Sequence, residues 1–316
     1  MPTTFAQGIA DWAAEQLAGR RAPRMRILSQ SVVTLHVESD SIRFLAAKQH
    51  RVLEWGLVPL PPGLVHEGVI SDPQAVGARI ETLLSAHRAV GGRLVLGLSA
   101  QRSMPRFLQF PPLNGSLLEE AVRREIKREA PMPLEEMHLA WQTLDSDGTQ
   151  TRVFALAVPR DAIEQHLAAL KATNRRPQAI DSKPLALVRA VGRADALIAD
   201  LEPDSIDVVV VRRCVPVITR TVGLRPDAST EEKVRRLGEE LTRTVKFYTD
   251  THREDQLPFS TPVFLTGSLA QEVAAAGVVE ASVAYQVESL APPVEYPPGL
   301  PLATYMVNVG LALKES

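Results

Sequence analysis

Residues 38–42 read Glu-Ser-Asp-Ser-Ile, and residues 202–206 read Glu-Pro-Asp-Ser-Ile, so a closely similar pattern recurs 164 positions further along the chain. In both places the sequence predicts an apolar strand before the pattern and two more strands after it. A repeat that includes its flanking strands indicates two halves of similar architecture, and such repeats determine the fold before finer detail does. The sequence therefore predicts an α/β protein with two related lobes.

The strands expected around the two patterns have equivalent places in the two halves. Their ranges are 32–37, 42–47 and 52–58 in the first half, and 196–201, 207–211 and 215–222 in the second. Each pattern joins a first strand to a second, so we expect both patterns to form the turns of β-hairpins.

The composition is that of an ordinary globular protein. The 316 residues include 35 Lys and Arg against 37 Asp and Glu, and 45% of them are hydrophobic. This charge balance disfavours a nucleic-acid partner, and the single cysteine excludes an internal disulfide framework, which fits the cytosol. No stretch approaches the ~18 consecutive apolar residues of a membrane span, and the first 25 residues have no apolar centre of a signal peptide.

A block with a different pattern separates the two halves. Its expected elements are a strand at 107–110, a helix from Ser116, strands at 138–144 and 152–158, and a helix at 161–172. We interpret this β-α-β-β-α order as an inserted subdomain. The predicted organisation is an N-terminal amphipathic helix at 1–25, a first lobe at 26–102, the inserted subdomain at 103–178, a helix of the first lobe at 179–194, and a second lobe with a closing helix at 195–316.

The N-terminal helix is expected to lie outside the main fold. Its apolar stripe consists of Phe5, Ile9, Trp12, Ala13 and Leu17, and the arginines that follow are Arg20, Arg21, Arg24 and Arg26. Docking on the chain's own surface is the favoured interpretation, because Asp11 and Glu15 weaken attraction to anionic lipid. Contact with an anionic membrane or with a partner helix is the alternative.

Standard catalytic signals are absent from the sequence. It contains no Gly-x-x-x-x-Gly-Lys phosphate loop, no Gly-x-Gly-x-x-Gly turn and no His-Glu-x-x-His pair. The seven histidines lack metal-ligand spacing, so no metal site is expected. Ser99 misses the nucleophile-elbow pattern at its last position and is interpreted as a hydroxyl at the end of a strand.

The stretch at 128–137, Arg-Glu-Ala-Pro-Met-Pro-Leu-Glu-Glu-Met, resembles the proline-rich stretch in the inserted subdomain of the PilM family of type IV pilus assembly proteins, relatives of FtsA. The segments at 158–160, 180–181 and 310–313 also fit that family, and the similarity runs from about Ile27 to the C-terminus. The resemblance implies an actin-like, or ribonuclease H-like, fold of two lobes that carries an FtsA-type insertion.

In the actin-like fold, glycine-rich hairpin turns from both lobes approach the phosphates of ATP, because backbone amides reach phosphate oxygens only where no side chain intervenes. The family's first turn reads Asp-x-Gly-Ser-Ser-Ser-x-Lys. Here His36 replaces the Asp that would organise a metal-bound water, Glu38 replaces the Gly, and Arg43 keeps the basic position. The serines at matching positions are Ser39 and Ser41.

The second turn and the adenosine-side turn depart from the family pattern in the same way. Asp200 matches the family's Asp, but Glu202 replaces the Gly that follows. Of the Thr-Gly-Gly on the adenosine side, Thr266 and Gly267 remain, and Ser268 replaces the second Gly. The resemblance therefore implies a nucleotide site whose pattern is degenerate in all three turns.

A carboxylate in each phosphate-binding turn is expected to repel ATP. Two like charges at ~4 Å interact by about 4 kcal/mol at an effective dielectric near 20, which is roughly three decades in affinity. We therefore expect no ATP, no Mg²⁺ and no ATPase activity. An active actin-like ATPase, in which bound Mg²⁺ offsets the repulsion, is the alternative.

The resemblance implies that the function rests on partner surfaces. It predicts a cytoplasmic scaffold at the inner face of the cell membrane that binds the cytosolic tail of a PilN-like membrane protein, links the platform to the pilus motor ATPase, and can form homo-oligomers. The tail is expected in a groove between the insertion and the first lobe, and the candidate wall residues are Leu98, Met104, Phe107, Leu108, Leu185 and Leu187. A cytosolic platform protein of a type II secretion or DNA-uptake system is the alternative.

Overall fold

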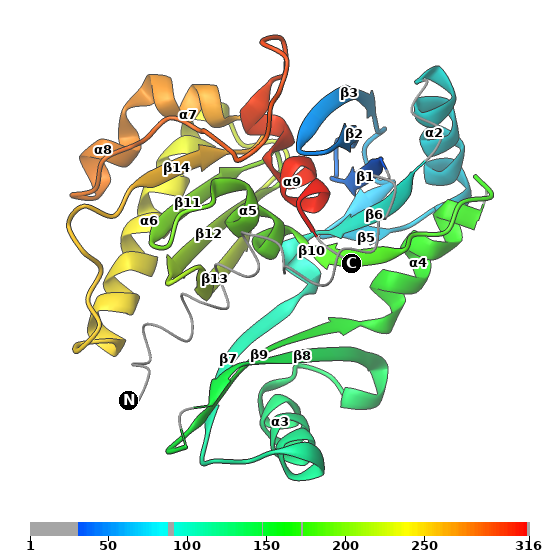
Figure 1. The fold of residues 1–316 in the computed structure, drawn as a ribbon. Helices are drawn as coiled ribbons and strands as arrows, with labels where there is room; N and C mark the ends of the chain where they lie inside the picture. The colour runs from blue at the N-terminus through cyan, green and yellow to red at the C-terminus, as the bar shows by residue number, and fades with distance from the viewer. Residues whose placement is uncertain (1–30, 88–91, 147, 172, 315–316) are drawn as a thin grey trace.

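The computed structural model describes residues 31–87, 92–146, 148–171 and 173–314, which form two lobes built on sheets and a smaller three-stranded unit (Figure 1). The amphipathic helix predicted at 1–25 lies outside the described residues. The structure is mixed α/β, and the sheets lie in the order along the chain that the internal repeat predicts.

The first lobe contains a five-stranded sheet in the order β10-β6-β1-β2-β3. Its strands are β1 (Val32–Val37), β2 (Ser41–Lys48), β3 (Arg51–Pro59), β6 (Arg93–Leu98) and β10 (Ala179–Ser182). Strands β1, β2 and β3 form the predicted antiparallel meander, and β6 runs parallel to both β1 and β10. A small hairpin, β4 (Val65–His66) and β5 (Val69–Ile70), was not predicted.

The sheet of the second lobe has the order β13-β12-β11-β14, which is equivalent to β3-β2-β1-β6 in the first lobe. Its strands are β11 (Ala196–Leu201), β12 (Ser205–Arg212), β13 (Val215–Gly223) and β14 (Val263–Thr266). The pair Leu201 and Ile206 closes the β11–β12 hairpin as Val37 and Ile42 close the β1–β2 hairpin. The repeat in the sequence is therefore also a repeat in the strand register.

Helices cover the outer face of each sheet and fill the space between the sheets (Figure 1). The outer helices are α2 (Pro73–Ala86) and α4 (Arg160–Lys171) on the first lobe, and α6 (Thr230–Thr251), α7 (Ala270–Ala276) and α8 (Val278–Ser282) on the second. Two of these helices begin at a side-chain cap: Asp72 accepts hydrogen bonds from the backbone N–H groups of Gln74 and Ala75, and Ser229 accepts one from that of Glu232.

Helices α5 (Lys183–Val191) and α9 (Leu302–Ala312) lie between the two sheets and share one core with both. They approach closely because residue 310 is glycine: a Cβ atom there would lie 1.8 Å from the carbonyl oxygen of Ala186. The shared core contains Val95 of the first lobe and Ile198 of the second, both fully buried. The two lobes therefore do not have separate cores at this boundary.

The inserted unit is a three-stranded sheet covered by one helix. Its elements are β7 (Met104–Phe110), α3 (Gly115–Glu129), β8 (Met137–Ser146) and β9 (Thr151–Pro159), with the strand order β7-β9-β8. Short 3₁₀ helices at Ala100–Arg102 and Leu134–Glu136 lie at its edges. The apolar face of α3 packs on the sheet through Leu118, Val122 and Ile126. The predicted order of these four elements is confirmed.

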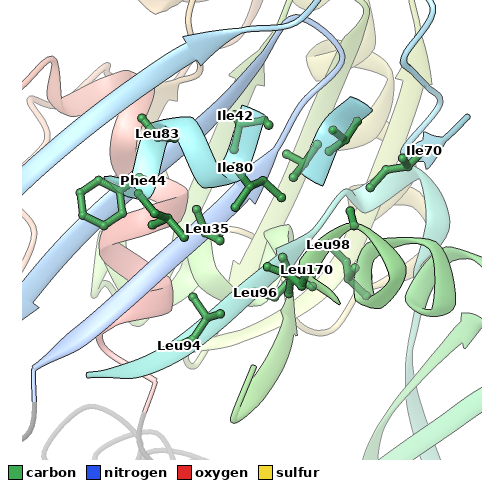
Figure 2. Packing of buried hydrophobic residues seen from close by; sticks show 14 of the residues in the cluster. Leu35, Ile42, Phe44, Ile70, Ile80, Leu83, Leu94, Leu96, Leu98 and Leu170 are labelled. Atoms are coloured by element: carbon green, nitrogen blue, oxygen red, sulfur yellow. The ribbon is translucent and has the colours of Figure 1, made fainter. Parts of the chain in front are cut away.

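Helix α4, which the sequence analysis placed in the insertion, packs on the first lobe instead. Its residues Ala162, Ala169 and Leu170 are buried in the same core as Ile80 of α2, and Figure 2 shows Leu170 among the side chains of this core. The apolar stripe of α4 was evident in the sequence, but a stripe does not specify which apolar surface it covers. The compact insertion therefore ends with β9.

Candidate functional site

The two repeated turns lie at the boundary between the lobes, and each is closed in the same way. The backbone N–H of Glu38 donates to the carbonyl of Ser41 at 2.9 Å, and that of Glu202 donates to Ser205 at 3.0 Å. The side chains of both glutamates are buried, with Glu38 4% and Glu202 0% exposed. Each carboxylate must therefore have partners inside the protein, because an unpaired buried charge is strongly unfavourable.

Arg43 of β2 pairs with Glu202 of the other lobe. Its Nη1 and Nη2 atoms lie 2.6 and 2.7 Å from the two carboxylate oxygens, a bidentate geometry, and Nη1 also donates to the carbonyl of Thr304 at 3.2 Å. Burial alone would raise the pKa of Glu202, but the charge and hydrogen bonds of Arg43 hold that pKa below its ordinary value. The pair is therefore ionised and crosses the lobe boundary.

Lys183, the first residue of α5, lies at the centre of the site. Its Nζ atom is 2.7 Å from Asp200 Oδ2, 3.0 Å from Glu38 Oε1 and 3.0 Å from Asp207 Oδ2. Burial would lower the pKa of Lys183, but Asp200 and the other carboxylates raise it well above its ordinary value. A fully buried ammonium thus joins one carboxylate of the first lobe to two of the second.

His36 of β1 is the second basic partner of Glu38. Its Nε2 atom lies 2.7 Å from Glu38 Oε1, and its Nδ1 atom lies 3.3 Å from the carbonyl oxygen of Gly97. Both ring nitrogens therefore face oxygen atoms, one on a carboxylate and one on the backbone. Burial would raise the pKa of Glu38, but Lys183 and His36 together hold it well below the usual range.

The adenosine-side turn is tied to the same carboxylates. Thr266 Oγ1 donates to Asp200 at 2.8 Å, and Ser268 Oγ donates to Glu202 at 2.7 Å. Gly267 has φ +96°, and a Cβ atom there would lie 2.3 Å from the carbonyl oxygen of Leu201. This glycine has a packing role that requires no nucleotide.

Asp200 carries the least favourable charge of the group. Burial, together with the charges of Glu202 and Asp207, raises its pKa to about 6 against the opposing effect of Lys183. We use the name interlobe cluster for the buried ionisable residues described so far: His36, Glu38, Arg43, Lys183, Asp200, Glu202 and Asp207.

The structure brings together most of the positions expected from the three turns. Those in contact are His36, Glu38, Arg43, Asp200, Glu202, Thr266, Gly267 and Ser268. Ser41 instead donates to Asp40 at 2.8 Å, and Ser39 lines a separate cavity on the outer side of the turns. Sequence analysis missed Lys183 and Asp207. The signal available for Lys183 was its position before Pro184 at the start of an apolar helix.

The cavity at the tips of the turns has a volume of about 280 Å³ and draws its walls from both lobes. Leu60 and Leu224 have equivalent places in the repeat, and each donates its backbone N–H to the turn of its own lobe, at Asp40 and Asp204, over 2.7 Å. Burial raises the pKa of both aspartates. Within the described chain no Lys or Arg lines this cavity, so it offers no cation to a triphosphate.

The family model of type IV pilus assembly protein PilM matches residues 30–217, more than half of the sequence. The chain belongs to the PilM family. A search of the curated proteins finds no match.

Solved structures show that this PilM-family chain has the actin-like fold. A chain of a PilM–PilN type IV pilus biogenesis complex superposes with a TM-score of 0.70 at 22% identity, covering 89% of this chain and 97% of that one. The cytoplasmic domain of EpsL, from the type II secretion system of Vibrio cholerae, gives 0.53 at 16% identity, covering 90% and 96%. A Bacteroides thetaiotaomicron protein with an actin-like ATPase fold gives 0.51 at 12% identity, covering 91% and 97%.

Three of the residues expected to form the partner groove of this PilM-family protein do not line a groove. Leu98, Leu108 and Leu187 are 3%, 6% and 0% exposed and belong to three different cores. An apolar residue at the end of a strand or inside a helix suits a core as well as a groove, so the sequence pattern could not separate the two. In the structure these three side chains belong to cores, and a partner groove between the insertion and the first lobe stays a prediction.

The other three expected wall residues, Met104, Phe107 and Leu185, are partly buried. Phe107 lines a groove of about 800 Å³ that lies between β7 of the insertion and β13 of the second lobe, with the end of α6 beside it. This groove adjoins the second lobe, whereas the sequence analysis expected the partner groove at the first lobe.

The described residues show neither a metal-binding cluster nor a membrane-spanning helix. No group of three or more His, Cys, Asp and Glu side chains there is arranged to hold a metal ion. Among the helices described, none is both long and apolar enough to cross a membrane.

Proposed function

We propose that this chain is a scaffold of type IV pilus assembly that needs no nucleotide and binds the cytosolic tail of a PilN-like membrane protein. Membership of the PilM family supports the assembly role. The observation that carries the nucleotide independence is that Glu38 and Glu202, which replace the phosphate-binding glycines, already have buried cationic partners.

A triphosphate would have to disrupt these pairs to reach the turns. Removing one partner from a buried ion pair costs about 3–5 kcal/mol, and the bidentate bond between Arg43 and Glu202 is of that kind. The cavity outside the turns has no Lys or Arg among its described lining residues. The pairing of both glutamates and the lack of a Lys or Arg in this cavity therefore disfavour ATP.

The groove beside Phe107 suits an extended peptide. Strand β7 is at the edge of the insertion's sheet and β13 is at the edge of the second lobe's sheet, so a peptide between them has a strand edge on either side. Phe247 of α6 lines the groove and is 56% exposed, which offers an apolar contact. A related PilM has been solved in complex with PilN, which supports a PilN-like tail as the occupant.

Titration calorimetry on the full chain tests both parts of the proposal. A synthetic PilN-like tail is expected to bind, and Mg-ATP is expected to give no heat at concentrations where an active ATPase saturates. Low-micromolar binding of Mg-ATP would instead support the active ATPase. A pull-down with the motor ATPase tests the expected motor contact. Light scattering tests the expected homo-oligomer.

Substitutions in the groove locate the tail. Phe247→Ala should weaken tail binding at least several-fold, since the removed ring is an exposed apolar contact in the groove. Phe259→Ala is the matched control because Phe259 is 88% exposed and does not line the groove. Equal binding by both variants would place the tail elsewhere.

A platform role in type II secretion is the second candidate, because the cytoplasmic domain of EpsL shares the fold. The same calorimetry with tails from the two kinds of system separates the candidates. Preference for a type II secretion tail would replace the pilus assignment. In either case, the protein would lie at the inner face of the membrane through its partner.

A further inference from the structure

The actin-like fold implies Mg²⁺ and ATP between the two turns, and the residues of this chain do not fit them. We propose that the ammonium group of Lys183 is a built-in cation that replaces the metal ion and holds the two lobes together. This inference rests on the nucleotide independence proposed above and assigns that property to one residue. Lys183 came from the structure and was not among the positions that the sequence indicated.

The ammonium group of Lys183 faces as many carboxylate oxygens as it has N–H groups. An ammonium group has three N–H donors, and three carboxylate oxygens lie 2.7–3.0 Å from Nζ, on Asp200, Glu38 and Asp207. All four side chains are at most 5% exposed. The contact with Glu38 Oε1 is a hydrogen bond, and the contacts with Asp200 and Asp207 are buried ion pairs at 2.7 and 3.0 Å.

The spacing of these carboxylates suits an ammonium better than a metal ion. Mg²⁺ requires oxygen ligands at about 2.0–2.1 Å, and Ca²⁺ takes them at about 2.3–2.6 Å. The observed distances from the centre of the site are 2.7–3.0 Å. This agrees with the absence, within the described chain, of a side-chain group arranged for a metal ion.

Lys183 also compensates charges that would otherwise separate the lobes. The interlobe cluster contains four carboxylates, on Glu38, Asp200, Glu202 and Asp207. Arg43 takes up the charge of Glu202, and the other three carboxylates all lie 2.7–3.0 Å from the Nζ atom of Lys183. Without Lys183, Glu38 of the first lobe would face two buried carboxylates of the second with no ammonium between them, and like charges at this depth repel strongly.

Thermal unfolding of Lys183→Ala tests the role through rescue by a small cation. The variant should unfold roughly 5–10 °C below the wild type, given the cost of an uncompensated buried charge. Methylammonium chloride should restore at least half of that loss, because its ammonium group can occupy the vacated position. Sodium chloride at the same ionic strength should not.

Lys233→Ala is the matched control. Lys233 is also buried, but its Nζ atom donates to the carbonyl of Pro226 at 3.3 Å and forms no ion pair within the described residues. Wild-type stability in Lys183→Ala overturns the proposal. The proposal is also overturned if sodium chloride rescues Lys183→Ala as well as methylammonium does. Equal rescue of Lys233→Ala by methylammonium would overturn it too.

A measurement on the wild type remains decisive even if Lys183→Ala does not fold. Titration with Mn²⁺, followed by electron paramagnetic resonance, should detect no bound ion at millimolar concentration. Micromolar binding displaced by Mg²⁺ would overturn the proposal. If the chain does not bind the PilN-like tail, the proposed function is wrong, but the results expected for Lys183→Ala and for Mn²⁺ do not change. The two proposals can therefore fail separately.

Discussion

The guanidinium group of Arg43 on β2 and the carboxylate of Glu202 at the end of β11 meet through two hydrogen bonds of 2.6 and 2.7 Å across the boundary between the lobes. The two residues are 159 positions apart in the sequence. Glu202 also accepts a hydrogen bond from Ser268. One carboxylate therefore joins β2, the second turn and the adenosine-side turn.

Replacing the guanidinium group of this pair should destabilise the protein. In Arg43→Lys the bidentate geometry is lost, and we expect a decrease of about 1–3 kcal/mol in the free energy of unfolding. Arg43→Met, which leaves Glu202 buried without its counter-ion, should cost about 3–5 kcal/mol. Urea unfolding measures both. Arg51→Met is the control, because the ion pair that Arg51 forms within the described residues is an exposed one with Glu295 at 4.0 Å, and its loss should change stability by less than ~0.5 kcal/mol.

The pKa of Glu202 predicts an acid-sensitive stability. Because this pKa is lowered in the folded state, the unfolded chain takes up a proton first as the pH falls, so the contribution of Glu202 is present above about pH 4.5 and is lost as the pH falls through the folded pKa. Glu202→Gln should therefore lose less stability than the wild type between pH 5 and pH 3. An equal loss in both proteins contradicts the ionised pair.

The pH dependence of stability expected from Asp200 has the opposite sign. Its folded pKa is raised to about 6, so the folded state binds the proton more tightly, and the contribution of Asp200 decreases as the pH rises from about 4 to 6. Between pH 5 and pH 7 this should remove about 1 kcal/mol. The pH slope of unfolding in this window should be smaller in Asp200→Asn. If the slopes coincide, the carboxyl group does not titrate there.

Gly267 should be required for packing in the complete absence of nucleotide. Gly267→Ala would place a Cβ atom 2.3 Å from a backbone oxygen at φ +96°, so we expect a loss of more than ~2 kcal/mol. Gly63→Ala is the matched control, since Gly63 has φ +88° but a Cβ atom added there would have no neighbouring atom within 4 Å. It should cost only about 1 kcal/mol. Similar losses in both would assign the effect to backbone conformation alone.

The sequence predicted the architecture well where the signal is local. The strands around the two repeated turns and the β-α-β-β order of the insertion both follow from periodicity and turn residues within a few positions of one another. Strand β10 was missed because it has four residues, too few to show a period. Helix α4 was placed in the insertion because its stripe does not identify its partner.

The sequence predicted where the candidate site lies but not which cations its carboxylates pair with. The pattern correctly brought Glu38 and Glu202 to the two turns, and their carboxylates were expected to be a source of repulsion. The structure shows each paired with a cation, and one of these, Lys183, is 145 positions from Glu38. No local pattern connects residues so far apart. Leu98 and Leu187 were assigned to a groove because an apolar side chain alone does not indicate whether protein or solvent faces it.

The ion pair between Arg43 and Glu202 also bears on synthesis of the chain. Arg43 leaves the ribosome well before Glu202 exists, so the nascent first lobe carries a cation whose buried site is incomplete. A truncated product that ends before the second turn can never complete it. Without the second lobe, the first lobe would therefore keep an unpaired cation at Arg43 and would leave its side of the shared core, which includes Val95, uncovered.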